Sequence, residues 1–244
     1  PSYWHWSLFL NAALRRRGCR IVMMNESHGG TESASGLKRA LKSQIVRRFH
    51  AGLVGGQPHA EYFSALGLPR ARIFPGYDAV DNAFFAREAD RARASAQTQR
   101  ARLHLPPAYI LSLGRMIEKK NLTRLVEAFA GIEQSAESGE PVHLVFVGSG
   151  ETEAGLRAAA HARGLPVIEH KEDAHESYDP AVPAVHFYGF RQIDDNPVFY
   201  GLARAFVLPS IYEEWGLVVN EAMAAGLPVV VSETLGCAPD LVAP

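Results

Sequence analysis

The sequence has few cysteines, no long apolar run and almost no net charge. Its 244 residues include only Cys19 and Cys237, which excludes the disulfide framework of small secreted domains. No window approaches the roughly 18 to 20 consecutive apolar residues of a membrane-spanning helix, and no secretory signal pattern is present. With 25 basic against 26 acidic side chains, no overall field attracts a polyanion, which argues against nucleic-acid binding. These absences indicate a cytoplasmic protein with reduced cysteines.

What remains is the composition of an ordinary globular protein, with 47% hydrophobic and 21% charged residues. At about 100 to 200 residues per domain, the length fits one large domain or two modest ones. The chain opens at Pro1 without a methionine and closes at Pro244 in what reads as a helix start. We therefore expect a fragment of a longer protein, cut at both ends.

Short apolar runs alternate with longer segments of helical period in the second part of the chain. Between the first two runs, residues 122–132 carry apolar side chains at helical spacing, and Asn121 is placed to cap that helix. Continuously apolar runs separated by helices predict a parallel sheet buried on both faces. We read residues 107–244 as a doubly wound α/β domain with strands at 109–113, 142–147, 185–188, 205–208 and 228–231.

The first part of the chain repeats this rhythm less clearly. Strands predicted at 20–24, 53–54 and 72–74, and helices near 3–14, 37–49 and 59–66, make only a thin sheet with an open edge. Residues 1–86 are therefore read as a partial Rossmann-like domain. The stretch 87–106, rich in Ala, Arg and Gln, has no strand signal and is predicted to be a linker.

The most informative stretch runs from Leu208 to Val230 and reads as a strand, a loop, a helix that opens near Gly216, and the next strand. Its loop places Glu213 and Glu214 beside the positive end of that helix, and Glu221 lies a little over one turn into it. Ligands of open parallel sheets bind at the carboxyl ends of the strands. Carboxylates at that edge can accept hydrogen bonds from the hydroxyls of a ribose or a sugar.

A second cluster, residues 114–121, supplies the opposite charge at the same edge of the sheet. It places Arg115 and Lys120 on a strand-to-helix loop. A guanidinium fork and a mobile ammonium together suit a diphosphate. The carboxylates and the cations therefore describe a site for a nucleotide diphosphate sugar.

The spacing of these motifs resembles a known family. Glu213-(x7)-Glu221, set among Pro209-Ser210, Trp215-Gly216 and Gly226-Leu227-Pro228, resembles the signature of family 4 retaining glycosyltransferases. Gly114-Arg115 with Lys120, Phe146-Val147-Gly148-Ser149-Gly150 and Phe187-Tyr188-Gly189 match that family in its order. The resemblance implies a GT-B fold of two Rossmann-like domains with parallel sheets, the N-terminal one incomplete. The family's N-terminal Gly-rich loop, its catalytic-face histidine and its C-terminal crossing helix are not found, so whether the chain alone turns over a donor stays open.

The resemblance also implies an activity and roles. It implies a retaining hexosyltransferase that moves a sugar from a nucleotide diphosphate sugar to a glycan, lipid-linked or small-molecule acceptor, with no cofactor and no metal. Arg115 and Lys120 would hold the diphosphate, and Glu213 would contact the donor sugar. Independently of the resemblance, His59 is an acceptor-side candidate from its place after Gly55-Gly56-Gln57-Pro58, and a merely exposed loop histidine is the alternative. The remaining donor-binding residues implied are Gly114, Ser149, Gly189, Trp215, Gly216, Leu217 and, on the ribose, Glu221.

Several features have a second interpretation. Glu214 is better read as favouring a helix start than as a ligand contact. The Gly148-Ser149-Gly150 turn lacks the third glycine of a dinucleotide fingerprint, because Glu153 takes its place. Segment 170–179 offers histidine and carboxylate ligands at close spacing, but a polar surface insertion is favoured over a metal site.

The helix predicted at 37–49 is strongly basic, with Lys38, Arg39, Lys42, Arg47 and Arg48. A helix packed on the core with a solvated outer face is favoured, and peripheral contact with anionic lipid at the inner face of the membrane is the alternative. Two other functions stay open for the whole chain: a non-catalytic nucleotide-sugar-binding module, and a nucleotide-sugar epimerase of related fold.

Overall fold

The computed structural model describes residues 15–31, 36–133, 141–171 and 174–242. The chain divides into two compact units. The first comprises Pro1–Ala79, Tyr212–Gly216 and Glu233–Pro244, and the second comprises Val80–Ile211 and Leu217–Ser232. The helix predicted near residues 3–14 lies outside the described residues.

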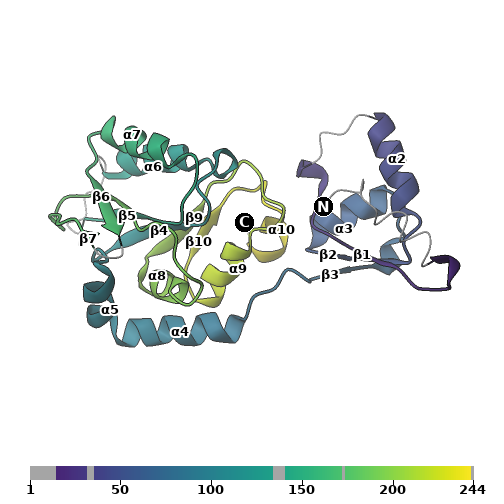
Figure 1. Ribbon diagram of the computed structural model, residues 1–244, viewed down its shortest axis with the longest axis horizontal. Coiled ribbons are helices and arrows are strands. Elements are labelled where there is room, and N and C mark those ends of the chain that lie inside the picture. Colours follow the sequence, from purple (N-terminus) through teal and green to yellow (C-terminus); the bar gives the residue numbers. More distant parts are fainter. Residues whose placement is uncertain (1–14, 32–35, 134–140, 172–173, 243–244) are drawn as a thin grey trace. The chain divides into compact units, whose positions relative to one another are not determined.

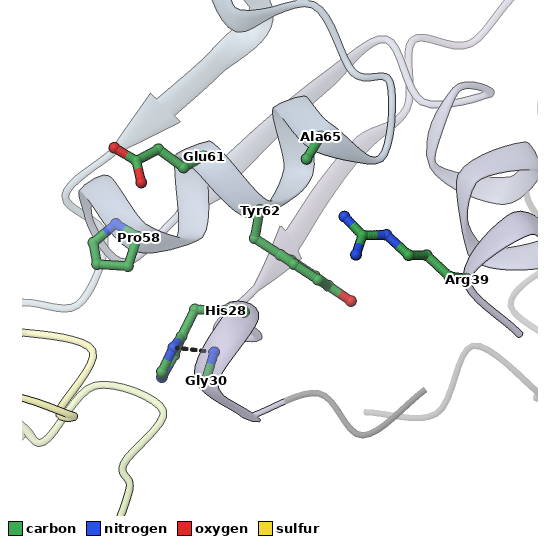
Figure 2. Close-up of a pocket in the computed structure, with 8 residues that line it drawn as sticks. His28, Gly30, Arg39, Pro58, Glu61, Tyr62 and Ala65 are labelled. Carbon is green, nitrogen blue, oxygen red and sulfur yellow. Dashed lines mark hydrogen bonds between the residues drawn. The ribbon is translucent and has the colours of Figure 1, made fainter. Parts of the chain in front are cut away.

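The first unit contains a parallel sheet in the order β1-β2-β3. Its strands are β1 (Val22–Asn25), β2 (Ala51–Val54) and β3 (Ile73–Pro75), close to the three predicted runs. Its helices are α2 (Gly36–Val46), α3 (Gln57–Ala65) and α10 (Ala238–Leu241), with short 3-10 turns η1 (Gly29–Thr31) and η2 (Arg70–Arg72). Buried apolar residues from α2, α3 and the strands form one core. A pocket lies between η1, α2 and α3 (Figure 2).

The second unit contains a seven-stranded sheet in the order β10-β9-β4-β5-β8-β6-β7. Neighbouring strands are parallel except at β6–β7. The five predicted strands are confirmed as β4 (Tyr109–Leu113), β5 (His143–Val147), β8 (Val185–Phe187), β9 (Ala205–Leu208) and β10 (Val229–Val231). Two strands at the far edge, β6 (Val167–Lys171) and β7 (Ala174–His175), were not predicted.

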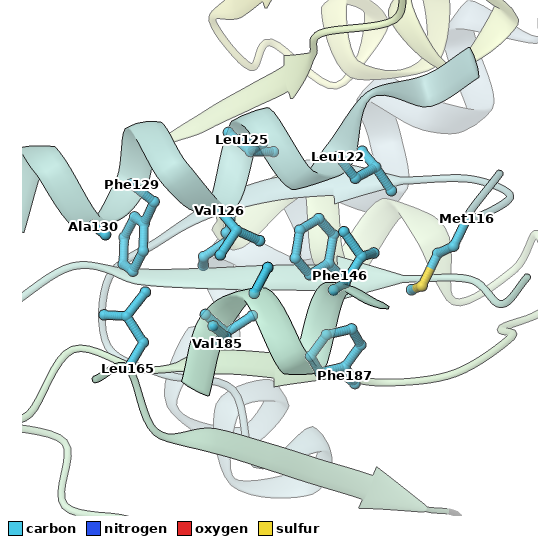
Figure 3. Packing of buried hydrophobic residues seen from close by; sticks show 14 residues of the cluster. Met116, Leu122, Leu125, Val126, Phe129, Ala130, Phe146, Leu165, Val185 and Phe187 are labelled. Atoms are coloured by element: carbon cyan, nitrogen blue, oxygen red, sulfur yellow. The ribbon is translucent and has the colours of Figure 1, made fainter. Parts of the chain in front are cut away.

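Helices cover both faces of this second sheet (Figure 1). On one face lie α6 (Leu122–Glu133) and α7 (Glu153–His161), and on the other lie α8 (Asn196–Leu202) and α9 (Leu217–Ala224). Figure 3 shows Val126 and Phe129 of α6 packing toward Phe146 of β5 and Phe187 of β8, all buried. The second unit is thus doubly wound, and the α/β architecture expected from the sequence is confirmed.

The stretch read as a linker is helical. It holds most of α4 (Asn82–Ala94) and all of α5 (Ala96–Leu103), and α4 packs against α8 and α9. Small residues allow a close approach, since Ala89 and Ala92 are buried and a side chain at Gly201 would collide with the Ala89 carbonyl at 2.8 Å. At the start of α4, the buried Phe85 also contacts Tyr200 of α8. Such a helix has no broad apolar stripe, which explains why its sequence resembles a linker.

The segment 170–179 was expected to be a polar surface insertion, but its first residue is not at the surface. His170 lies in β6 and is only 3% exposed. Its Nε2 lies 2.9 Å from Nδ1 of His186, whose Nε2 lies 2.9 Å from Nδ1 of His143. This row of three imidazoles buries polar atoms by pairing them with one another. Residues 172–173 lie outside the described chain.

The predicted cap of α6 also differs in detail. Asn121 adopts a left-handed conformation (φ 54°), and its side-chain amide donates to the Pro209 carbonyl at 3.2 Å. Asn121 therefore ties the start of α6 to the loop that follows β9.

Candidate functional site

Three turns at the carboxyl ends of β4, β5 and β8 are joined by backbone hydrogen bonds. The Gly114 N–H donates to the Val147 carbonyl at 2.9 Å, and the Gly148 N–H donates to the Gly189 carbonyl at 2.7 Å. Gly148 has φ +129°, and a Cβ there would lie 2.0 Å from the Gly114 carbonyl oxygen. Only glycine can occupy that position. Gly114, Ser149 and Gly189, predicted separately, are brought together at one edge of the sheet.

A cavity of about 180 Å³ opens among these turns, lined by Gly114, Arg115, Ser149, Phe190, Arg191 and Asn196 among others. Asn196 is 9% exposed, and its Oδ1 is buried with no hydrogen-bond partner among the described residues. Arg191 Nε is also buried and unpartnered there. Unpaired buried polar atoms are costly unless something pairs with them. Both residues line the cavity, beside the exposed cation of Arg115.

Three residues of this cavity, Phe190, Arg191 and Asn196, were not predicted as site residues. A signal was present, because all three follow the strand predicted at 185–188 and so lie after a carboxyl end at the predicted ligand edge.

Lys120 is held beside the same turns. It ends the 3-10 turn η3 (Glu118–Lys120), and a Cβ built on Gly114 would lie 3.9 Å from its Nζ. The turn is fixed to the loop after β9, because the Ile211 N–H donates to the Lys119 carbonyl at 2.8 Å. The structure therefore places the two predicted cations, Arg115 and Lys120, around Gly114.

Glu221 lies on α9, which starts at the exposed Leu217, and is held by a tyrosine. The Tyr200 hydroxyl donates to Glu221 Oε2 at 2.8 Å. Burial raises the pKa of the Glu221 carboxyl, and the bond from Tyr200 partly opposes that rise. A fixed, half-buried carboxylate of this kind is a strong acceptor for hydroxyl groups.

Two histidines of the first unit hold successive backbone carbonyls of residues 212–216. The Gly30 N–H donates to Nδ1 of His28 at 3.2 Å, so the His28 proton resides on Nε2, which donates to the Glu213 carbonyl at 2.8 Å. In the same way, His59 accepts from the Gly56 N–H at 3.2 Å and donates to the Glu214 carbonyl at 2.8 Å. Burial lowers the pKa of His59, which favours this neutral form.

The predicted site residues of the first unit lie at or next to these hydrogen bonds. Glu213 and Trp215 are 6% and 5% exposed, and Gly216 has φ +107°. His59 is fully buried, and both of its ring nitrogens bind backbone groups. His28 has the matching arrangement and was not predicted. A lone histidine after a short strand carries no pattern that could have revealed it.

Within the described part of the chain, no group of three or more His, Cys, Asp or Glu residues is arranged to hold a metal ion. No helix among the same residues is long and apolar enough to cross a membrane.

Comparison with known proteins places these features in a family. The family described as "Glycosyl transferases group 1" matches residues 107–244. An uncharacterized glycosyltransferase of Methanocaldococcus jannaschii is 34% identical over 127 residues, which cover 52% of this chain and 27% of that protein. Mannosylfructose-phosphate synthase of Agrobacterium fabrum is 30% identical over 169 residues, covering 68% of this chain and 34% of the synthase. The chain thus spans about a third or less of the length of these relatives.

The fold also matches solved structures. Anabaena Alr3699/HepE, solved in complex with UDP, superimposes with a TM-score of 0.70 at 18% identity, over 97% of this chain and 59% of that one. With such structural neighbours, the fold is GT-B, as the resemblance implied.

Proposed function

Because this chain belongs to the glycosyl transferases group 1 family, we propose that it takes part in transferring a sugar from a nucleotide diphosphate sugar to an acceptor hydroxyl, with retention at the anomeric carbon. The acceptor is a glycan, a lipid-linked sugar or a small molecule, and the proposal involves neither cofactor nor metal. The UDP bound to the Anabaena protein supports a sugar-nucleotide donor.

The observation that carries the proposal is the cavity at the three joined turns. Its unpartnered Asn196 Oδ1 and Arg191 Nε supply an acceptor and a donor for a planar polar group, and exposed Phe190 supplies a ring to stack on it. Hydrogen-bonding groups for a planar polar ligand and a ring that stacks on it are both properties of a nucleobase site. Arg115 and Lys120 flank the neighbouring Gly114, where a diphosphate attached to that nucleoside would follow.

In the proposed reaction, the bond between the anomeric carbon and the diphosphate oxygen breaks, and a bond from that carbon to the acceptor oxygen forms on the same face. The acceptor hydroxyl proton passes to the leaving diphosphate. Arg115 and Lys120 stabilise the negative charge that grows on the leaving group, which is the electrostatic part of catalysis.

The two glutamates of the Glu-(x7)-Glu pattern have separate proposed roles. Glu221, held by Tyr200, accepts hydrogen bonds from the ribose hydroxyls. Glu213 contacts the donor sugar, with Trp215 and Gly216 shaping its loop. His59 acts on the acceptor side as a positioning residue, because its ring nitrogens already bind the backbone.

We place this activity in the cytoplasm, because Cys19 and Cys237 are both unpaired thiols. The basic helix α2 supports association with the inner face of a membrane as a second arrangement.

One assay separates the proposal from its alternatives. The chain is incubated with UDP-glucose, GDP-mannose and ADP-glucose, and free nucleoside diphosphate and the anomeric configuration of the released sugar are followed by NMR. Retaining transfer to water predicts free diphosphate and an α sugar from an α donor. Binding without release supports a nucleotide-sugar-binding module. An isomerised sugar still attached to its nucleotide supports an epimerase.

A further inference from the structure

A feature that the proposed function does not use is the pocket of the first unit, about 460 Å³ in volume, between η1, α2 and α3. That volume lies in the range of about 300 to 1,000 Å³ typical of small-molecule sites. Figure 2 shows Arg39 and Tyr62 extending toward each other from α2 and α3, with His28 and Gly30 on the turn beside them. Glu61 and Pro58 complete the side formed by α3.

Two cations flank Tyr62. Arg39 lines the pocket, is exposed, and forms no ion pair or hydrogen bond with any residue that the structure describes. One turn along α2, Lys42 Nζ donates to the Tyr62 hydroxyl at 3.2 Å. No acidic residue lies on α2, so these charges are not neutralised from their own helix.

Whereas α2 supplies cations, α3 supplies a carboxylate, that of Glu61. Glu61 Oε1 accepts from the Gln57 side chain at 3.0 Å, and Gln57 in turn accepts from Arg70 at 3.1 Å. The second carboxylate oxygen of Glu61 has no partner within the described chain. Glu61 is therefore oriented by its neighbours and retains an oxygen that can accept from a hydroxyl group.

His28 does not add to the positive charge of the pocket. Its Nδ1 accepts from the Gly30 N–H and its Nε2 donates to the Glu213 carbonyl, so both ring nitrogens already bind backbone groups. Arg39 is therefore the cation that lines the pocket, and Lys42 contributes its charge through its bond to the Tyr62 hydroxyl.

We propose that this pocket binds an acceptor that carries a phosphoryl group, with the phosphoryl oxygens on Arg39, the charge of Lys42 behind Tyr62, and a hydroxyl group on Glu61. A guanidinium offers paired donors to phosphate oxygens, and an ammonium adds a point charge. The inference rests on the proposed function, since it names the acceptor class of that reaction. The phosphoryl group belongs either to a water-soluble sugar phosphate or to a lipid headgroup.

The test compares Arg39→Gln with a matched control, Lys38→Gln. Lys38 is the neighbouring exposed cation on α2 and does not line the pocket. The parent chain and both variants are titrated calorimetrically with glucose 6-phosphate, with glucose, and with vesicles containing phosphatidylglycerol. We expect glucose 6-phosphate to bind more tightly than glucose, and Arg39→Gln to weaken it by about tenfold or more while Lys38→Gln changes it less than about twofold.

Each outcome has a defined meaning. The same selective loss seen only with vesicles assigns the phosphoryl group to a lipid headgroup. Equal losses in both variants, or equal affinity for glucose and glucose 6-phosphate with no vesicle binding, overturn the proposal. UDP and GDP titrated against Arg39→Gln serve as the independent readout of the donor site. Unchanged nucleotide binding with no phosphate selectivity rejects the acceptor class alone, whereas absent nucleotide binding in the parent rejects the proposed function.

Discussion

His59 donates from Nε2 to the backbone carbonyl of Glu214 at 2.8 Å, although 155 residues separate the two in sequence. The same ring accepts the Gly56 N–H at Nδ1, so one neutral imidazole joins the start of α3 to the loop that carries Glu213 and Trp215. His28 makes the matching bond to the preceding carbonyl, that of Glu213. The pair fixes the backbone of this loop within the first unit.

Replacing His59 with Ala should destabilise the chain. The part-buried Glu214 carbonyl and the buried Gly56 amide lose their bonds to the ring, which costs about 1 to 3 kcal/mol. Urea denaturation measures the effect. His161→Ala, at the exposed end of α7, is the matched control and should change stability by less than about 0.5 kcal/mol. Equal stability of the two variants would show that the bond contributes nothing.

Gly148→Ala should be far more damaging than Gly155→Ala. At position 148 the new Cβ meets the Gly114 carbonyl at 2.0 Å with φ +129°, whereas position 155, in α7, has nothing within 4 Å. We expect Gly148→Ala to cost about 2 to 4 kcal/mol and to abolish nucleotide binding. Gly155→Ala should stabilise the chain by about 0.5 to 1 kcal/mol. Thermal unfolding of the two variants compares them directly, and similar melting temperatures contradict the proposed turn geometry.

Glu221→Ala should weaken nucleotide binding by about 1.5 to 3 kcal/mol, because charge-assisted hydrogen bonds to the ribose are lost. Tyr200→Phe should weaken it less, since the carboxylate remains but its orienting bond is removed. Glu118→Ala, an exposed carboxylate on η3, is the control. Calorimetry with the nucleotide that binds the parent gives the affinities, and an unchanged value for Glu221→Ala removes this residue from the ribose site.

Lys120→Ala should lower the rate of donor cleavage more than the affinity for the nucleoside. In the proposed reaction its charge acts on the leaving diphosphate, so its contribution is expected to be greatest where negative charge develops. Lys119→Ala is the control from the same turn. Cleavage rates and nucleoside affinities measured side by side test the separation, and a Lys120→Ala rate equal to that of the parent would exclude it from the mechanism.

The imidazole row should make the chain sensitive to acid. Burial, and then the neighbouring His143 and His170, lower the pKa of His186 from its ordinary 6.5 to about 2. The unfolded chain therefore binds a proton below about pH 6.5 that the folded chain refuses, and stability falls as the pH drops from there toward 2. Denaturation midpoints between pH 4 and 8 should show this slope. His186→Gln should flatten it and His161→Gln should not, and identical slopes would assign the acid sensitivity elsewhere.

Much of the second unit was predictable because its strands are continuously apolar. Residues of β5, such as Val145 and Phe146, are buried on both faces, and a short run of this kind is typical of a central parallel strand. By contrast, β6 is apolar only in its first two residues: Glu169 then pairs with Arg157 at 2.6 Å, and His170 is buried against other histidines. Such partners come from distant segments, so local sequence cannot reveal them.

The candidate site likewise contains some residues that the sequence predicts and others that it does not. The positions of Arg115, Lys120 and Gly148 could be predicted because all three follow predicted parallel strands, whose carboxyl ends meet at one edge of the sheet. Asn196 precedes a proline at a helix start, where polar residues usually cap helices, so nothing in the sequence marks its unpaired oxygen. The role of His28 depends on a carbonyl 185 residues away.

The proposed function depends above all on the cavity formed by Arg115, Ser149, Arg191 and Asn196 being the binding site of a donor nucleotide. Calorimetric titration of the chain and of its Asn196→Leu variant with UDP, GDP and ADP, each with and without EDTA, tests this directly. We predict that one nucleotide binds the parent, that EDTA leaves its affinity unchanged, and that Asn196→Leu weakens it by about tenfold or more. Failure of all three nucleotides to bind the folded parent, or equal binding by parent and variant, would refute the assignment of this cavity.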